Sequence, residues 1–148
     1  MNLTVFWNFV SEADRAYDYH RKKIMSKFSL SAIEVDVLLF LANNPEKNTA
    51  ADIVRLRKIA KSHVSLAVRS LTEKNLISQQ SDSKKRRIIR LTPTPSADEI
   101  ITFGRSEQKK FTEALSRGAN CTDREAFNRR LIEITENLRE EYETNQKE

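Results

Sequence analysis

Hydrophobic residues recur at helical spacing along most of the chain. In residues 3–25 they lie three, four or seven positions apart and form one stripe: Leu3, Phe6, Val10, Ala13, Tyr17 and Ile24. The segment after Ser31 is apolar on almost every side, which predicts a central, buried helix. Ser31 and Glu34 have the spacing of a capping box that opens this helix, and Asn43-Asn44-Pro45 ends it.

A short helix and an amphipathic helix are expected next. Thr49 can cap the short helix, and a break follows at residues 57–60. The second helix spans residues 61–74, with an apolar face made of Val64, Ala67, Val68 and Leu71. Its opposite face carries two small residues, one basic residue and one apolar residue: Ser62, Ser65, Arg69 and Leu66. Asn75 tolerates the left-handed conformation that ends such a helix.

The remaining pattern predicts a hairpin followed by two helices. Strand-like residues 76–81 and 88–92 flank the basic segment 82–87. Thr92-Pro93 is the expected start of a helix that runs to about Arg117. We expect Thr122 and Glu125 to form the capping box of the last helix. Its apolar stripe is Phe127, Leu131, Ile134 and Leu138.

Composition fits this helical pattern. The 148 residues include only 2 glycines and 3 prolines, too few for an all-β fold with many tight turns. The predicted fold class is therefore mainly α with a small β-hairpin, in a single domain of residues 1–148. No apolar run reaches bilayer length and no secretory signal is evident, so we expect a cytoplasmic protein. The single cysteine, Cys121, excludes an intramolecular disulfide.

Positive charge is concentrated in the middle of the chain. The whole sequence carries a formal charge of +5, but residues 55–90 contain eleven lysines and arginines against two acidic residues, a net +9. Such a basic centre indicates a module that binds a polyanion. Charge alone is equally compatible with a solvated basic face.

The order of elements, with an amphipathic helix before a basic hairpin, is that of a winged helix-turn-helix. A helix can enter the DNA major groove when one face packs on the protein and the other offers short or hydrogen-bonding side chains. Arg69 can pair with guanine, and Leu66 can meet a thymine methyl group. The hairpin tip can contact the phosphate backbone or the minor groove. The expected DNA-binding residues are Lys61, Ser62, His63, Ser65, Leu66, Arg69, Lys84, Lys85, Arg86 and Arg87.

These features resemble the MarR (multiple antibiotic resistance regulator) family. The resemblance rests on residues 62–77 (SHVSLAVRSLTEKNLI), 82–87 (DSKKRR) and 90–92 (RLT), and its flanking helices match over nearly the whole chain. Two residues depart from the family pattern. Asn75 stands where the family usually has glycine, and Lys85 replaces the second aspartate of the wing. That aspartate helps to hold a DNA-contacting arginine, so the resemblance implies a more basic and less selective wing here.

The resemblance implies a winged helix-turn-helix core at residues 30–92 and dimerisation helices at residues 1–25 and 93–148. A two-fold homodimer would present two recognition helices to half-sites about 10 bp apart on a pseudo-palindromic operator. The implied function is a sequence-specific, ligand-responsive repressor of transcription. Its effector would be a small aromatic or amphipathic molecule in a pocket lined by Trp7, Tyr17, His20, Phe28 and Phe40. We favour the alternative that these five residues serve ordinary packing.

Other functions have less support in the sequence. Nucleophile elbows, glycine-rich phosphate loops, paired carboxylates and zinc-ligand spacings do not occur, so we expect no enzyme, no metal and no cofactor. Cys121 lacks a resolving partner and is interpreted as an incidental thiol rather than a redox switch. RNA or single-stranded DNA binding is disfavoured because no aromatic stacking platform accompanies the basic segment. The principal alternative is a winged-helix protein-interaction adaptor or antagonist without specific DNA binding, which would not need the basic segment.

Overall fold

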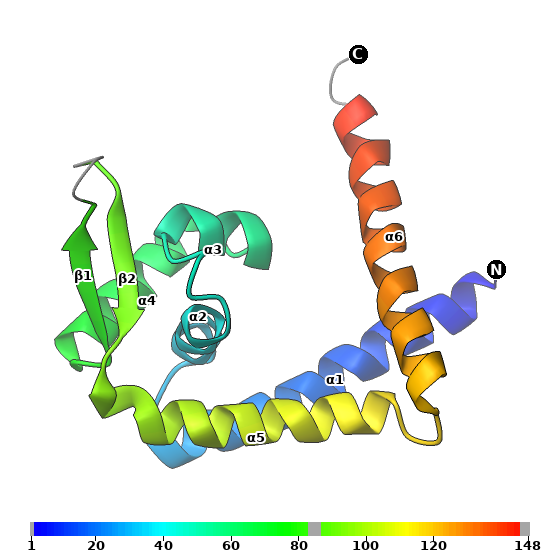
Figure 1. The fold of residues 1–148 in the computed structure, drawn as a ribbon, viewed down its shortest axis with the longest axis horizontal. Coiled ribbons are helices and arrows are strands. Elements are labelled where there is room, and N and C mark those ends of the chain that lie inside the picture. The colour runs from blue at the N-terminus through cyan, green and yellow to red at the C-terminus, as the bar shows by residue number, and fades with distance from the viewer. Residues whose placement is uncertain (1, 83–86, 146–148) are drawn as a thin grey trace. The chain divides into compact units, whose positions relative to one another are not determined.

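The protein is mainly α-helical with one two-stranded hairpin, which confirms the predicted fold class (Figure 1). The computed structural model describes residues 2–82 and 87–145. In chain order, the elements are α1 (Leu3–Phe28), α2 (Ala32–Asn43), α3 (Ala50–Arg57), α4 (Lys61–Glu73), β1 (Ile77–Ser81), β2 (Ile89–Pro93), the 3₁₀ helix η1 (Pro95–Ala97), α5 (Asp98–Leu115) and α6 (Cys121–Asn145).

The chain divides into two compact units, residues 1–111 and 112–148. The first unit holds α1 to α4, the hairpin and most of α5, and it therefore contains the whole predicted winged core at residues 30–92. The second unit holds the end of α5 and all of α6. None of the helices in the described ranges 2–82 and 87–145 has the length and apolar character needed to cross a membrane.

Helix α2 is the centre of the first unit. Eight of its residues, from Glu34 to Leu41, are buried, which confirms the prediction from its all-round apolar pattern. Side chains from every neighbouring element complete the core around it, including Ile24 of α1, Ile53 of α3 and Leu91 of β2. Gly104 of α5 lies against Leu39 of α2, where a β-carbon would come within 2.6 Å of the leucine.

Two capping boxes begin the helices of the core. The Ser31 hydroxyl accepts the Glu34 N–H at 3.2 Å, and the Glu34 carboxylate accepts the Ser31 N–H at 2.7 Å. Thr49 and Asp52 form the same reciprocal pair at the start of α3. Asn75, just after α4, has a φ of 56°, the left-handed conformation predicted for it. These local signals are confirmed.

The predicted start of α5 was wrong by one Thr-Pro repeat. Thr92 and Pro93 belong to β2, where they lie opposite Ser78 and Ile77 of β1. Thr94 and Pro95 provide the helix start instead, with Pro95 as the first residue of η1. Both Thr-Pro pairs suit a helix start locally. Strand pairing decides between them, because it holds the first pair in the extended conformation.

The predicted start of α6 was also wrong. Helix α6 begins at Cys121, and the Asn120 side chain accepts the Asp123 N–H at 2.9 Å while Asp123 accepts the Asn120 N–H at 3.4 Å. This pair replaces the expected box of Thr122 and Glu125. Asn and Asp are as good as Ser or Thr at an N-cap, and the earlier cap adds residues to the helix.

Candidate nucleic-acid interface

Helix α4 has one buried and one exposed face. Val64, Ala67 and Leu71 are at most 5% exposed and pack into the core. All six residues predicted to contact DNA from this helix are exposed: Lys61, Ser62, His63, Ser65, Leu66 and Arg69. Leu66 is 61% exposed. The exposed face is therefore mostly small and basic, with one apolar side chain.

The turn before α4 exposes the start of the helix. Lys58 adopts a left-handed conformation with a φ of 54°, which reverses the chain after α3. Ala60 is the N-cap of α4 and provides no side-chain acceptor. The first backbone N–H groups of α4 consequently have no capping side chain and lie beside Lys61 and Ser62.

The end of α4 is held by a buried carboxylate. Glu34 is 5% exposed and accepts hydrogen bonds from the Ser70 hydroxyl at 2.6 Å and the Lys74 ammonium at 2.7 Å. Burial alone would raise the pKa of Glu34, but hydrogen bonds from Lys74, Ser70 and Ser31 outweigh burial and lower this pKa to about 2. Glu34 is therefore ionised at neutral pH and joins α2 to α4. The sequence alone predicted only the capping role of Glu34.

A second buried carboxylate connects α2 with α1 and α3. Asp36 is 7% exposed and accepts hydrogen bonds from Arg21 at 2.8 Å and from the Tyr17 hydroxyl at 3.2 Å. Arg57, the last residue of α3, lies 3.4 Å from the same carboxylate. Burial, followed by the nearby negative charge of Asp36, raises the pKa of Tyr17. Sequence reasoning missed this cluster, although an aspartate inside an apolar helix signals a buried polar contact.

Strand β2 of the hairpin is anchored through Asn48 to the loop between α2 and α3. The Arg90 guanidinium binds Asp82 at 3.0 Å and the Asn48 side chain at 3.0 Å. The Leu91 N–H also donates to the Asn48 carbonyl at 2.8 Å, and the Asp82 N–H donates to the Ile88 carbonyl at 2.8 Å. The strands are thereby fixed to the loop between α2 and α3.

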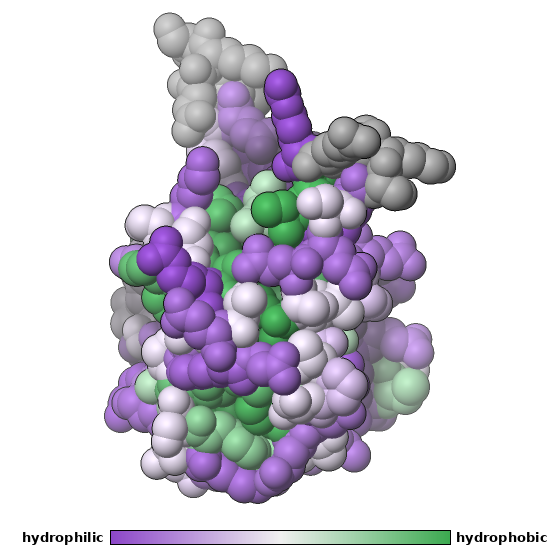
Figure 2. Space-filling model, turned by 90° about the vertical axis from the view of Figure 1, so that its left-hand side faces the viewer, coloured by the Kyte–Doolittle hydropathy of each residue, from purple (hydrophilic) through white to green (hydrophobic). Residues whose placement is uncertain are grey.

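The described part of the hairpin tip carries one exposed arginine. Arg87 is exposed, whereas the predicted contacts Lys84, Lys85 and Arg86 lie outside the described residues. Figure 2 looks onto the hairpin side of the molecule, where hydrophilic side chains surround a strip of hydrophobic ones. The exposed face of α4 and the hairpin thus offer hydrogen-bonding groups and positive charge to a polyanion.

The five residues predicted to line an effector pocket lie in different environments. Tyr17 and His20 share a cavity of about 10 Å³, roughly the space of one water molecule. Phe28 packs edge-on against Phe103 at 5.7 Å, and Phe40 belongs to the core. Trp7 is 61% exposed and contacts Phe6. The structure does not bring these five residues together around one cavity.

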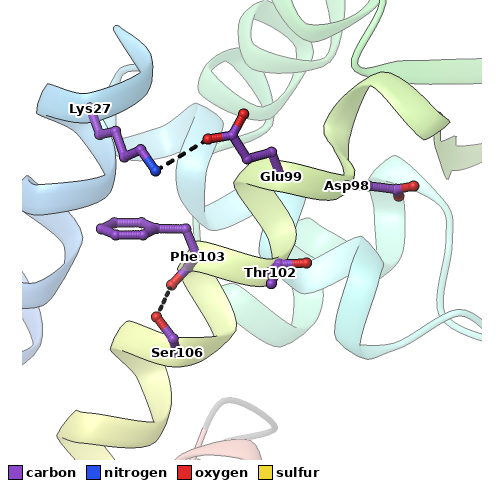
Figure 3. Close-up of a pocket in the computed structure, with 6 residues that line it drawn as sticks. All are labelled: Lys27, Asp98, Glu99, Thr102, Phe103 and Ser106. Atoms are coloured by element: carbon purple, nitrogen blue, oxygen red, sulfur yellow. Dashed lines mark hydrogen bonds and ion pairs between the residues drawn. The ribbon is translucent and has the colours of Figure 1, made fainter.

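A larger hollow of about 440 Å³ lies at the surface between α1 and α5 (Figure 3). Lys27 forms an ion pair with Glu99 at 3.2 Å across this hollow, and its ammonium lies 4.5 Å from the centre of the Phe103 ring. Phe103 is the only aromatic residue among the described residues that line this hollow. The remaining lining residues are Asp98, Thr102 and Ser106.

Comparison with known proteins supports the resemblance. The sequence model of the MarR family matches residues 28–88. No curated protein matches the sequence closely enough to count as a relative.

Solved structures extend the likeness to almost the whole chain. A putative MarR family transcriptional regulator from Listeria monocytogenes, complexed with 26mer DNA, has a TM-score of 0.81 at 15% identity and covers 96% of this chain and 93% of its own. The S. aureus MepR–DNA complex has a TM-score of 0.72 at 17% identity, with 93% and 96% covered. Bordetella bronchiseptica BpsR, whose DNA binding is regulated by 6-hydroxynicotinic acid, has a TM-score of 0.64 at 18% identity, with 86% and 91% covered. The chain thus resembles the MarR family in sequence over residues 28–88, and it shares the fold of these solved structures along most of its length.

Proposed function

We propose that this protein is a sequence-specific regulator of transcription that binds double-stranded DNA as a homodimer. The observation that carries the proposal is the division of α4, whose apolar face is buried while its six small, basic and apolar candidate contacts are exposed. The exposed face is suited to base edges in the major groove, and the basic hairpin is suited to the adjacent backbone. Two solved structures of similar fold contain DNA.

A homodimer accounts for the exposed apolar side chains outside this face. They lie in the first part of α1 and along α6: Leu3, Val5, Trp7, Phe9, Val10, Phe127, Leu131, Ile132, Ile134 and Leu138. Large exposed apolar patches mark interaction surfaces. We therefore propose residues 1–25 and 93–148 as the dimerisation region. The dimer would read two half-sites of a pseudo-palindromic operator about one helical turn apart.

The proposal extends to a repressor whose DNA affinity falls when a small aromatic effector binds. Support comes from the structural likeness to BpsR, whose regulator is an aromatic acid. A ligand that binds one arrangement of the two recognition helices better than the other would shift the dimer away from the arrangement that DNA requires. The proposal is tested by adding 6-hydroxynicotinic acid to a preformed protein–DNA complex. An unchanged affinity would argue against an effector of this kind.

Selection from a random duplex pool tests the DNA-binding proposal. Bound fragments would be sequenced, and the enriched duplex and a scrambled duplex would be titrated by fluorescence anisotropy at several salt concentrations. An enriched inverted repeat bound far more tightly than the scrambled duplex is expected. The absence of enrichment, with a shallow dependence on salt, would favour the alternative of a protein-interaction adaptor.

A further inference from the structure

Two kinds of contact hold α4 in the first unit. Val64, Ala67 and Leu71 bury its apolar face in the core. These apolar contacts determine which face of α4 is buried, but because they are non-directional they leave small rotations of the helix about its own axis less strictly defined. Hydrogen bonds and ion pairs depend on direction and distance. The exact rotation of α4 within the limits set by its apolar face therefore depends on its polar contacts with neighbouring elements.

The strongest of these contacts involve Glu34. One carboxylate oxygen, Oε2, accepts the Ser31 N–H at 2.7 Å and completes the capping box. The other oxygen, Oε1, accepts from Ser70 at 2.6 Å and from Lys74 at 2.7 Å. Ser70 lies in the last turn of α4 and Lys74 is the C-cap residue four positions further on, so both lie on one flank of the end of the helix. A single buried carboxylate thus fastens the start of α2 to one flank of the recognition helix.

A second polar contact lies on another flank of α4. Gln79 of β1 donates from its side-chain amide to the Thr72 hydroxyl at 2.9 Å, and Thr72 in turn donates to the Val68 carbonyl. Thr72 is exposed enough for water to replace Gln79, whereas Glu34 is almost fully buried. A buried, charged hydrogen-bond acceptor is costly to leave without partners. Rotation of α4 away from Glu34 is therefore more strongly opposed than rotation away from Gln79.

We infer that Glu34 is a positioning residue for DNA recognition, which sets the rotation of α4 through Ser70 and Lys74. This inference rests on the proposed function, because it concerns how Ser62, Ser65 and Arg69 are presented to base edges. A bidentate contact to a base tolerates little displacement, whereas phosphate contacts tolerate more. Loss of the contacts of Glu34 with Ser70 and Lys74 should consequently weaken binding to the preferred sequence and leave non-specific binding nearly unchanged.

The substitution Glu34→Gln separates positioning from simple electrostatics by the sign of its effect. It keeps the shape of the side chain but removes a negative charge near a DNA-binding face. Electrostatics alone would strengthen binding to every duplex. Positioning predicts about tenfold weaker binding to the selected operator, with less than about a twofold change on scrambled duplex. Glu46→Gln is the matched control, because it removes the same charge from an exposed site in the loop between α2 and α3.

A second variant covers the case in which Glu34→Gln does not fold, as judged by circular dichroism. Lys74→Met keeps the apolar stem but removes the ion pair, and Lys74→Arg keeps a cation in place. We expect Lys74→Met to lower the ratio of operator to scrambled affinity and Lys74→Arg to restore most of that ratio. A phosphate-contacting lysine would instead lower both affinities together and reduce the salt dependence.

The outcomes distinguish this inference from the proposed function. If the wild-type protein prefers no duplex, the proposed function fails. If the wild-type protein is selective but Glu34→Gln and Lys74→Met keep the wild-type ratio of operator to scrambled affinity, the positioning role is overturned and DNA binding stands. A lowered ratio in Glu34→Gln or Lys74→Met, with an unchanged ratio in Glu46→Gln, supports the positioning role.

Discussion

His20 on α1 and Glu107 on α5 form a buried contact, with Nδ1 of the imidazole 2.7 Å from Oε2 of the carboxylate. Glu107 is only 1% exposed. Lys110 binds its other oxygen, and Lys23 of α1 lies 3.4 Å away. An ionised carboxylate can only accept hydrogen bonds, so His20 donates through Nδ1. This cluster fastens α1 to α5 inside the first unit.

The cluster predicts how the free energy of unfolding depends on pH. Burial alone would raise the pKa of Glu107, but the hydrogen bonds from His20 and Lys110 outweigh burial and lower the pKa from 4.5 to about 2. A carboxyl group whose pKa is lower in the folded state stabilises the protein above its ordinary pKa. That contribution disappears as pH falls towards the folded-state value. We therefore expect wild-type protein to lose stability between about pH 5 and pH 2, and Glu107→Gln to lose less over the same interval.

Chemical denaturation at several pH values measures this difference. At neutral pH, Glu107→Gln should lower the free energy of unfolding by about 1–3 kcal/mol, because His20, Lys23 and Lys110 lose an ionised partner. Glu12→Gln, at an exposed carboxylate on α1, is the control and should behave like wild type. Parallel pH curves for wild type and Glu107→Gln would contradict the assignment.

The close approach of α5 to α2 makes Gly104 sensitive to substitution. A β-carbon at this position would lie 2.6 Å and 2.9 Å from the two methyl carbons of Leu39, which is itself 1% exposed. Gly104→Ala should lower the free energy of unfolding by about 1–3 kcal/mol through overpacking, even though alanine favours helices by about 1 kcal/mol. Thermal or urea unfolding measures the change. Thr102→Ala, on an exposed site of the same helix, should not destabilise, and Leu39→Val should recover part of the loss in Gly104→Ala.

Arg69 is expected to read a base. Arg69→Ala should weaken operator binding by about 1–3 kcal/mol and relax the preference at one base pair, because a bidentate contact to guanine is lost. Titration of duplexes that vary at single positions measures this effect. Arg15→Ala removes the same charge from an exposed site on α1 and should leave the preference intact. Equal losses on operator and scrambled duplex would show that Arg69 contacts phosphate instead.

The hairpin tip is expected to contact the DNA backbone. Arg87→Ala should weaken binding to all duplexes by a similar factor. It should also reduce the steepness of the plot of log affinity against log salt concentration by about one. The same result is expected for Lys84→Ala and Lys85→Ala, at two predicted contacts beyond the described residues. Anisotropy titrations across a salt series provide the slope. An unchanged slope would show that the hairpin does not contact the DNA phosphates.

The apolar stripe of α6 is expected to hold the dimer together. Leu131→Lys should shift the protein towards monomer and weaken binding to a two-half-site operator, because it places a charge among Phe127, Ile134 and Leu138. Sedimentation over a range of protein concentrations measures the shift. Glu136→Lys introduces the same residue about 140° further around the helix and serves as the control. A dimer that is equally stable in both variants would exclude this stripe from the interface.

Local features of the fold were predictable from sequence because their contacts close within a few residues. The Ser31–Glu34 and Thr49–Asp52 boxes and the left-handed Asn75 each depend on neighbours along the chain. The division of α4 into two faces followed from helical periodicity, which converts sequence spacing directly into orientation. The resemblance to the MarR family rested on the order of these same elements. Each was therefore accessible without tertiary information.

Where two local signals competed, only the tertiary structure could decide. Thr92-Pro93 and Thr94-Pro95 are equivalent as helix starts, and pairing of Thr92 with Ser78 in the hairpin assigned the first pair to a strand. Asn120 displaced Thr122 at the start of α6 in the same way. Local propensity ranks such alternatives too closely to separate them.

The buried carboxylates depended wholly on tertiary structure. Glu34 meets Lys74 across 40 positions of sequence, and Glu107 meets His20 across 87. No periodicity relates residues so far apart. Their pairing follows from how α1, α2, α4 and α5 pack, and burial then requires each charge to be matched by donors. The sequence by itself determined the helices, the hairpin and the exposed face of α4. Packing alone determined which charges lie inside and hold α4 in place, because a long-range contact exists only once the chain has folded.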